Sequence, residues 1–272
     1  MLRVENVKVY DLAESIVASG YAMGLNIEEF VGQPEIFEKW LNHVEDKPIT
    51  ESDSKENWLR RFRSCVKNTD FDKACSLFRI KDENDKKELQ IALKNFDRII
   101  RLVNASRNGN VKCHHNFMTG IRVSFDLIYP NYISPEMQRY HWFDIVTSSS
   151  KMHRIMKMDF DKCCNEYVTE ETKENMKKYI EDYNRILNTP VSGSLSETDK
   201  HSEELYKAFM KVVSNCPQGV ELFMRISTNY MQLQTMYFQR QNHRLKEDWG
   251  NFCKFIESLP MAEELIMNKC YD

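Results

Sequence analysis

Glycine and proline are scarce in this sequence, with 8 and 7 residues in a chain of 272. Because both residues interrupt helices, their scarcity favours a mainly helical protein. No run of apolar residues approaches the roughly 18 that a membrane-spanning helix needs, and the first residues, MLRVENVKVYDLAE, lack the apolar stretch of a signal peptide. We therefore expect a cytoplasmic protein with no membrane partner.

Neither sign of charge dominates, because 38 Lys and Arg residues stand against 41 Asp and Glu residues and give a net charge of -3. Such a balance predicts no general nucleic-acid binding, so any anion recognition has to be local. Hydrophobic residues make up 42% and charged residues 29%, as in ordinary globular proteins. The length suits one large domain or two small ones.

Several common catalytic and redox motifs are also missing. The sequence holds no glycine-rich phosphate loop, no GxSxG elbow and no HExxH helix. Its eight cysteines include the adjacent pair Cys163 and Cys164 but no CxxC. This usage is typical of reduced, buried or incidental thiols rather than of a disulfide framework.

The apolar pattern predicts a small sheet surrounded by many helices, an α+β fold whose sheet is antiparallel or mixed. The clearest strand is 120–129, where every second residue from Ile121 to Leu127 is apolar and the residues between are polar. A shorter strand is expected near 7–10.

Capping and proline signals predict where several helices begin. Asp11 with Glu14 forms a capping box, Pro34 is a first-turn proline, and Ser134-Pro135-Glu136 is another helix start, just before residue 138. One long helix has a buried face at helical spacing, formed by Leu89, Ala92, Leu93, Phe96, Ile99, Ile100 and Val103. The expected helices cover 13–22, 34–44, 56–67, 71–80, 85–103, 152–160, 169–188, 203–214, 220–241, 247–259 and 262–270. Polar loops are expected at 45–56, 104–110 and 189–198.

Three groups of residues have the chemistry of a site. The first is Cys113-His114-His115-Asn116, whose thiol and imidazoles are metal ligands. Adjacent residues rarely point at one ion, however, and no second cluster has ligand spacing. A histidine at the entrance to a pocket is therefore the better interpretation, and we expect no metal.

The second group is the segment QRYHWFDIVTSSSKMHR, residues 138–154. Arg139 and His141 can donate hydrogen bonds to phosphate or carboxylate, and Lys151 adds a point charge. The three serines between them, at 148–150, add hydroxyls and backbone donors. The residues alone leave two alternatives open, an anion site and a polar turn at a helix end.

The third group lies in 228–245. Leu233, Met236 and Tyr237 form an apolar stripe that predicts core packing. Arg240, His243 and Arg244 are three and four residues apart and can share a helix face. Three cations on one face favour an anionic ligand or acidic partner, and the alternative is a solvated face.

The region from 114 to 151 resembles the signature region of the flavin-dependent thymidylate synthases, the ThyX family. In that family a His opens a strand, a Gln precedes Arg-His-Arg, and seven residues later comes a Ser followed, two positions on, by an Arg. The matching positions here are His114, Gln138, Arg139-Tyr140-His141, Ser149 and Lys151.

Two other segments are similar to the same family. ESIVASGYA looks like its first helix, which ends at a flavin-contacting serine, here Ser19. The C-terminal segment is similar to its closing helices, where Arg244 or Arg240 would be the arginine at the substrate base. The resemblance implies a single ThyX-like domain over 1–272, with an extra helical insertion at about 30–105.

The resemblance also implies a reaction. Reduced FAD would carry a one-carbon unit from methylenetetrahydrofolate to C5 of dUMP or a related pyrimidine nucleotide, with NADPH as co-substrate and no cysteine nucleophile. It implies a homotetramer with sites at subunit interfaces. The residues implied to contact FAD are Ser19, His114, Asn116, Arg139, Tyr140 and His141. The residues implied to contact the nucleotide are Gln138, Arg139, Ser149 and Lys151. Arg244 or Arg240 would stabilise negative charge on the pyrimidine base.

The sequence differs from the family pattern at several positions. Tyr140 and His141 replace the His and the second Arg of Arg-His-Arg, Thr119 replaces an acidic residue, and Gln232-Leu233-Gln234 replaces Asn-Leu-Arg. These differences support an alternative, a catalytically altered nucleotide-binding or regulatory protein with the same fold. A helical interaction module without a ligand is a third hypothesis.

Overall fold

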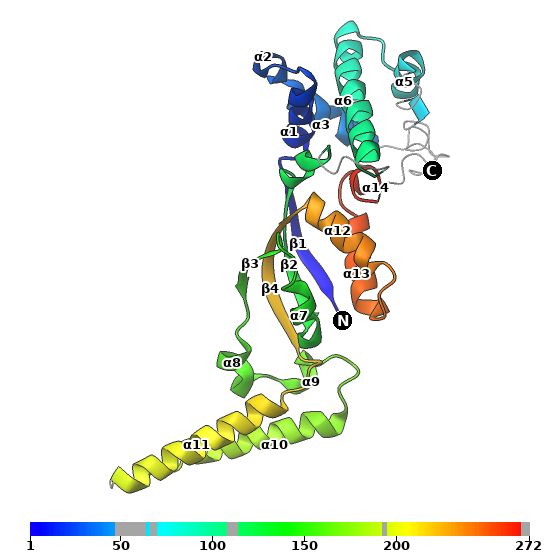
Figure 1. Cartoon of the computed structure of the whole chain (residues 1–272). Coiled ribbons are helices and arrows are strands. Elements are labelled where there is room, and N and C mark those ends of the chain that lie inside the picture. The colour runs from blue at the N-terminus through cyan, green and yellow to red at the C-terminus, as the bar shows by residue number, and fades with distance from the viewer. Residues whose placement is uncertain (47–63, 66–69, 108–113, 192–194, 268–272) are drawn as a thin grey trace. The chain divides into compact units, whose positions relative to one another are not determined.

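The computed structural model describes residues 1–46, 64–65, 70–107, 114–191 and 195–267 (Figure 1). The strands in these residues are β1 (Arg3–Tyr10), β2 (Arg122–Pro130), β3 (Asp144–Ser148) and β4 (Glu221–Asn229). The α-helices are α1 (Leu12–Ala18), α2 (Ile27–Phe30), α3 (Gln33–Asp46), α5 (Phe71–Phe78), α6 (Glu83–Arg107), α7 (Ser134–Met137), α8 (Lys151–Arg154), α9 (Phe160–Cys163), α10 (Glu170–Leu187), α11 (Leu195–Asn215), α12 (Tyr230–Arg240), α13 (Lys246–Glu257) and α14 (Ala262–Leu265).

The strands form one sheet in the order β1-β2-β4-β3. The edge strand β3 runs antiparallel to β4, with Asp144 opposite Ser227 and an irregularity in register between Ile145 and Thr147. A small sheet combined with many helices confirms the predicted α+β fold. Within the described residues, no helix is long and apolar enough to cross a membrane.

The chain forms two compact units. The first unit contains Met1–Val7, Ser124–Ser227 and His243–Phe252, and the second contains Lys8–Val123, Thr228–Asn242 and Cys253–Asp272. The expectation of a single domain with an insertion at about 30–105 stays a prediction.

Aromatic packing and one buried carboxylate organise the first unit. Phe125 and Phe143 pack at 6.0 Å between ring centroids, and Phe252 lies 6.1 and 6.3 Å from them. The buried Asp248 accepts hydrogen bonds from the Leu2 amide at 2.8 Å and the Tyr132 hydroxyl at 2.7 Å. Burial, together with Asp248, raises the pKa of Tyr132, so its hydroxyl stays protonated and this pair is a stable buried bond.

A long helical hairpin, α10 and α11, also belongs to the first unit (Figure 1). Thr169 caps α10 by accepting from the Thr172 amide at 3.3 Å. The rings of Tyr183 and Phe209 meet between the helices at 6.4 Å. The helix predicted for 169–188 is confirmed, and the one predicted for 203–214 is confirmed as part of α11, which already begins at Leu195 within the predicted loop 189–198.

Helix α6 packs against α1, α3 and α5 in the second unit. Trp40 of α3 meets Phe78 of α5 edge to face at 5.2 Å, and Phe37 packs on Phe96 at 4.6 Å. The predicted buried face of α6 is confirmed; only Leu93 is partly exposed, and it packs at the margin of the cluster around Trp40. Pro34 lies in the first turn of α3, as predicted.

The strand β2 was predicted correctly, whereas β4 was predicted to be part of a helix. Val123, Phe125 and Leu127 of β2 are fully buried, as their alternation predicts. The helix predicted for 220–241 is wrong over 221–229, where β4 buries alternate residues, and right over α12. The strand β4 ends at Asn229 and helix α12 begins at the next residue; the Asn229 side chain accepts a hydrogen bond from the Gln232 amide at 2.9 Å and caps α12.

Other boundaries also differ from the prediction. Asp11 makes no side-chain cap, because it adopts a left-handed conformation with φ 56°, so the predicted capping box is wrong. The predicted loop 104–110 is wrong up to Arg107, where α6 ends, and the predicted loop 45–56 is wrong up to Asp46. The helix predicted for 152–160 is broken into α8, a 3-10 turn and the start of α9. Most of 56–67, and parts of the other expected loops and of 262–270, lie outside the described residues.

Candidate functional site

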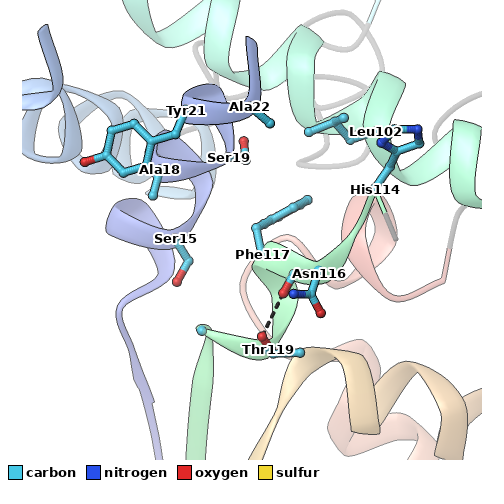
Figure 2. Close-up of a pocket in the computed structure, with 11 residues that line it drawn as sticks. Ser15, Ala18, Ser19, Tyr21, Ala22, Leu102, His114, Asn116, Phe117 and Thr119 are labelled. Carbon is cyan, nitrogen blue, oxygen red and sulfur yellow. Dashed lines mark hydrogen bonds between the residues drawn. The ribbon is translucent and has the colours of Figure 1, made fainter. Parts of the chain in front are cut away.

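A pocket of about 460 Å³ lies in the second unit, between the end of α1 and the 3-10 turn Asn116–Thr119 (Figure 2). Its volume is within the range of small-molecule sites, roughly 300–1,000 Å³. Ser15, Ser19 and Tyr21 come from the α1 side, and Asn116 and Phe117 come from the turn. Leu102 of α6 and His114 complete one end.

The wall at the end of α1 is held by an arginine of α6. The Arg98 guanidinium donates to the carbonyls of Ile16 at 3.1 Å and Val17 at 3.0 Å, and it also donates to Asn95 Oδ1. Helix ends leave carbonyls without partners, and a cation there satisfies them and opposes the negative end of the helix dipole. Arg98 therefore fixes where α1 ends and where Ser19 begins the next turn.

The hydroxyl of Ser19 is fully engaged. It donates to the Ile16 carbonyl at 2.6 Å and accepts from Arg98 Nε at 3.1 Å. Ser19 lines the pocket, but its hydroxyl is hydrogen-bonded to Ile16 and Arg98 and is not a free donor.

Arg98 contributes an electrostatic field beside this wall. Burial and the charge of Arg101 lower the pKa of its guanidinium, which still stays cationic because arginine is a very strong base. Its hydrogen-bond acceptors in the described chain are two carbonyls, a hydroxyl and an amide oxygen, and none is a carboxylate. The charge is thus solvated by dipoles rather than neutralised, which favours an anion nearby.

The opposite wall is a tight 3-10 turn. The Thr119 hydroxyl donates to the Asn116 carbonyl at 2.7 Å, shown dashed in Figure 2, and the Gly120 amide donates to the Phe117 carbonyl at 3.0 Å. Met118 is fully buried and anchors the turn. A Cβ atom at Gly120 would lie 2.4 Å from Ser15 Oγ, so the glycine allows the two walls to approach.

Three polar groups of the pocket are uncommitted. Within the described residues, the Ser15 hydroxyl, the Asn116 side-chain amide and the His114 imidazole make no hydrogen bond, while all three line the pocket. With Tyr21 and Phe117, they give the pocket two aromatic side chains and a few directional hydrogen-bonding groups. This combination suits a planar, polar, heteroaromatic ligand.

His115 behaves differently from its neighbour His114. Its Nδ1 is buried with no hydrogen-bond partner in the described residues, and burial lowers the pKa of the imidazole. No cluster of metal ligands occurs in the part of the chain that the structure describes. Cys113, the first residue of the motif Cys113-His114-His115-Asn116, lies outside that part.

The predicted cofactor residues fall into two sets. Ser19, His114 and Asn116 all line the pocket of the second unit. Arg139, Tyr140 and His141 follow α7 in the first unit. Arg139 and His141 are exposed, and the His141 ring packs against Trp142 at 5.2 Å.

The predicted nucleotide residues lie in the first unit. Gln138 donates from Nε2 to Ser134 Oγ at 3.2 Å, and Lys151 is the first residue of α8. Ser149 lines a cavity of about 580 Å³, but its hydroxyl accepts from the Phe223 amide at 3.1 Å and its amide donates to the Phe223 carbonyl at 2.8 Å. Ser149 therefore extends the pairing of β3 with β4.

The predicted cationic helix face is wrong. Helix α12 ends at Arg240, so His243 and Arg244 do not continue its face. His243 accepts from the Leu245 amide through Nδ1 at 3.2 Å, and its Nε2 lies 3.7 Å from a Glu136 oxygen. The apolar stripe is buried as predicted and consists of Leu233, Met236 and Tyr237.

Sequence reasoning missed Ser15, Phe117 and Arg98. The signal for Arg98 was present, because Asn95 and Arg98 are polar residues three apart beside the apolar face of α6. Asn95 is buried and donates to the Ile91 carbonyl at 2.9 Å. Polar residues that interrupt a buried helix face in this way indicate a specific hydrogen-bond network.

The fold and the pocket define an α+β protein with a small-molecule cavity. No protein-family model and no curated protein matches the chain. Among solved structures, two of thymidylate synthase X (ThyX) from Helicobacter pylori with FAD and dUMP are similar to it at a TM-score of 0.38 and 12% identity. The first match covers 76% of this chain and 93% of that chain, and the second covers 78% and 95%.

Proposed function

We propose that this chain is a flavin-dependent enzyme that methylates dUMP, or a related pyrimidine nucleotide, with methylenetetrahydrofolate as one-carbon donor and NADPH as reductant. The observation that supports this proposal is the convergence of Ser19, His114 and Asn116 on one pocket. These residues come from two segments far apart in the sequence. They are also the positions that the sequence resemblance assigns to FAD.

The pocket has the chemistry that a flavin nucleotide needs. Tyr21 and Phe117 contribute aromatic side chains to its lining, and Ser15 with Asn116 contributes uncommitted hydrogen-bonding groups. Arg98 adds a positive charge beside the wall, which suits the negative charge of a phosphate. FAD is larger than a pocket of about 460 Å³, so this pocket would hold part of it.

Each residue has a defined task in this proposal. Asn116 and Ser15 bind and orient the cofactor, Phe117 excludes water from one face, and Arg98 holds Ser19 in the wall. A bound flavin would supply the electron and one-carbon transfer that no side chain provides. Further residues proposed for the nucleotide and the remaining cofactor contacts are Gln138, Arg139, Tyr140, His141, Ser149 and Lys151, with Arg240 or Arg244 stabilising charge on the base.

A homo-oligomer belongs to the same proposal. A pocket that holds only part of FAD in one chain suits a site completed by a second copy. The mass of the protein in solution, measured by light scattering with and without FAD, tests this expectation. A monomer at all concentrations would contradict it.

A second candidate is a nucleotide-binding or regulatory protein without turnover. It is favoured by Ser149, whose hydroxyl oxygen already accepts the Phe223 amide and so is less available to a phosphate. Such a protein would bind a pyrimidine nucleotide without carrying out methyl transfer.

Ligand binding separates these candidates. We expect the purified protein to bind FAD, seen as quenching of flavin fluorescence, and dUMP to raise the melting temperature of the FAD complex. Formation of methylated nucleotide with methylenetetrahydrofolate and NADPH completes the test. Stabilisation by dUMP without FAD binding favours the second candidate, and failure of both ligands to bind contradicts both.

A further inference from the structure

Three cysteines of the first unit lie on two segments that pair with each other where α9 ends and the chain approaches β4. Cys163 is the last residue of α9, Cys164 follows it, and Cys216 follows α11. All three are reduced and half-buried. Neither the proposed reaction nor the flavin pocket uses any of them.

Backbone hydrogen bonds hold the two segments side by side. Cys164 forms an antiparallel bridge with Val220, and the Asn165 amide donates to the Gly219 carbonyl at 2.9 Å. The Val220 amide donates to the Pro217 carbonyl at 3.2 Å, which closes a turn that begins next to Cys216. Gly219 makes this approach possible, because a Cβ atom there would lie 2.5 Å from Asn165 Oδ1 and from Val168 Cγ2.

The three thiols are electrostatically coupled. The side chains of Cys163 and Cys164 share a hydrogen bond, which lowers the pKa of Cys163 and raises that of Cys164. Burial raises the pKa of Cys216, Lys151 opposes this effect, and a negative charge on Cys163 adds to it. Cys163 is therefore the thiol of the three that most readily becomes a thiolate, which is the reactive form.

Solvent reaches Cys163 from one side. It lines the open cavity of about 580 Å³ in the first unit, together with Arg154, Lys157 and Lys162. Neither Cys164 nor Cys216 lines this cavity. A small, soluble oxidant that enters the cavity meets Cys163 first.

We propose that Cys163 and Cys216 form a peroxide-responsive thiol pair. The Cys163 thiolate attacks one oxygen of hydrogen peroxide, the O–O bond breaks, and Cys163 becomes a sulfenic acid while hydroxide leaves and is protonated to water. The Cys216 thiolate then attacks the sulfenic sulfur, forming the disulfide and releasing a second water. Two electrons pass from the two sulfurs to the peroxide.

Cys216 rather than Cys164 is the resolving thiol for a geometric reason. Consecutive Cα atoms lie about 3.8 Å apart, which is shorter than the roughly 4.4–6.8 Å that disulfides usually span. Oxidation of Cys163 also removes the negative charge that hinders ionisation of Cys216, so the first step promotes the second. The disulfide would tie the end of α9 to the turn before β4.

Peptide mapping of the whole protein after hydrogen peroxide treatment tests the proposal. We expect a cross-link between the Cys163 and Cys216 peptides that dithiothreitol reverses, while the buried Cys75 and Cys253 in the same digest stay reduced. In a variant with Cys113 and Cys270 replaced by serine, a titration of free thiols counts only the described cysteines. After peroxide treatment this titration should show two fewer free thiols per chain.

Single substitutions separate the roles. Cys163→Ser should abolish the cross-link, and Cys216→Ser should leave a sulfenic acid on Cys163 that dimedone traps. Cys164→Ser should slow the first step but keep the same cross-link, because it removes only the hydrogen bond that stabilises the thiolate. A Cys163–Cys164 disulfide in the native sequence, or an unchanged cross-link in Cys163→Ser, would overturn the proposal.

Discussion

Arg98 Nε donates a hydrogen bond of 3.1 Å to the hydroxyl of Ser19, so an arginine of α6 fixes a residue that lines the pocket. The same guanidinium satisfies two carbonyls at the end of α1. The position of this wall thus depends on a side chain that does not line the pocket.

Arg98→Met should destabilise the protein and weaken FAD binding. The substitution removes one hydrogen bond from each of the Ile16 carbonyl, the Val17 carbonyl and the Ser19 hydroxyl, at a cost of about 0.5–1.5 kcal/mol for each bond lost. Urea denaturation measures the first effect and a flavin titration the second.

Arg98→Lys is the matched control. It keeps the charge but loses the planar set of donors, so it should recover only part of the stability. If Arg98→Met has native stability and native FAD affinity, the role given to Arg98 is wrong.

Asn116→Ala should reduce affinity for FAD by roughly 2- to 10-fold, the equivalent of one hydrogen bond of about 0.5–1.5 kcal/mol. Stability should change little, because the side-chain amide makes no hydrogen bond in the described chain. Isothermal titration calorimetry measures the affinity. Asn188→Ala, at the end of α10, is a control that should leave FAD binding unchanged.

Gly120→Ala should narrow the pocket. Its new Cβ atom would lie 2.4 Å from Ser15 Oγ, so Ser15 has to rotate and the FAD affinity should fall. Gly250→Ala is the matched control, because nothing lies within 4 Å of its added Cβ atom and alanine favours the helix α13. Thermal melting should show that Gly250→Ala raises the free energy of unfolding by about 0.5–1 kcal/mol. Equal FAD affinity in both variants would contradict the proposed pocket.

Asp126 should make the first unit sensitive to acid. Its carboxylate accepts from Asn6 Nδ2 at 2.6 Å and Arg225 Nη1 at 3.1 Å, and these bonds, with the Arg225 charge, hold its pKa below the usual value of 3.8. A depressed pKa stabilises the fold above the unfolded value, and this stabilisation is lost as the pH falls through the folded value.

Melting temperatures from pH 6 to pH 3 check this expectation. Asp126→Asn should lower stability at pH 6 and flatten the decline below pH 4, because the variant has no carboxylate to protonate there. Glu174→Gln removes an exposed carboxylate on α10 that makes no hydrogen bond or ion pair within the described residues, and it serves as the control. An identical decline in Asp126→Asn and the native protein would rule out this linkage.

Much of the fold could be predicted from local patterns. The apolar face of α6 and the alternation of β2 each repeat over many residues, so their periods identify both elements. The sequence around Phe223 has the same alternation, but it runs directly into the apolar stripe of α12, and the combined pattern resembled one long helix. The cap formed by Asn229 is what divides them.

The site was harder to predict, because its chemistry depends on partners distant in the sequence. Ser19 and Ser149 were identified as ligand contacts from motifs, yet each hydroxyl oxygen accepts a hydrogen bond within the protein. No motif shows that Arg98 or Phe223 supplies that bond. The convergence of Ser19 with Asn116 likewise depends on tertiary packing.

The interleaved composition of the two units has a consequence for how the protein folds. Leu2 and Asp248 are 246 positions apart and share a buried hydrogen bond, and each unit combines segments from several parts of the chain. Contacts of such long range slow folding, because the entropy of closing long loops is lost before the contacts form. During synthesis the first unit is completed only after Phe252 has emerged, so we expect its N-terminal segment to pack late and the protein to tolerate removal of 243–252 poorly.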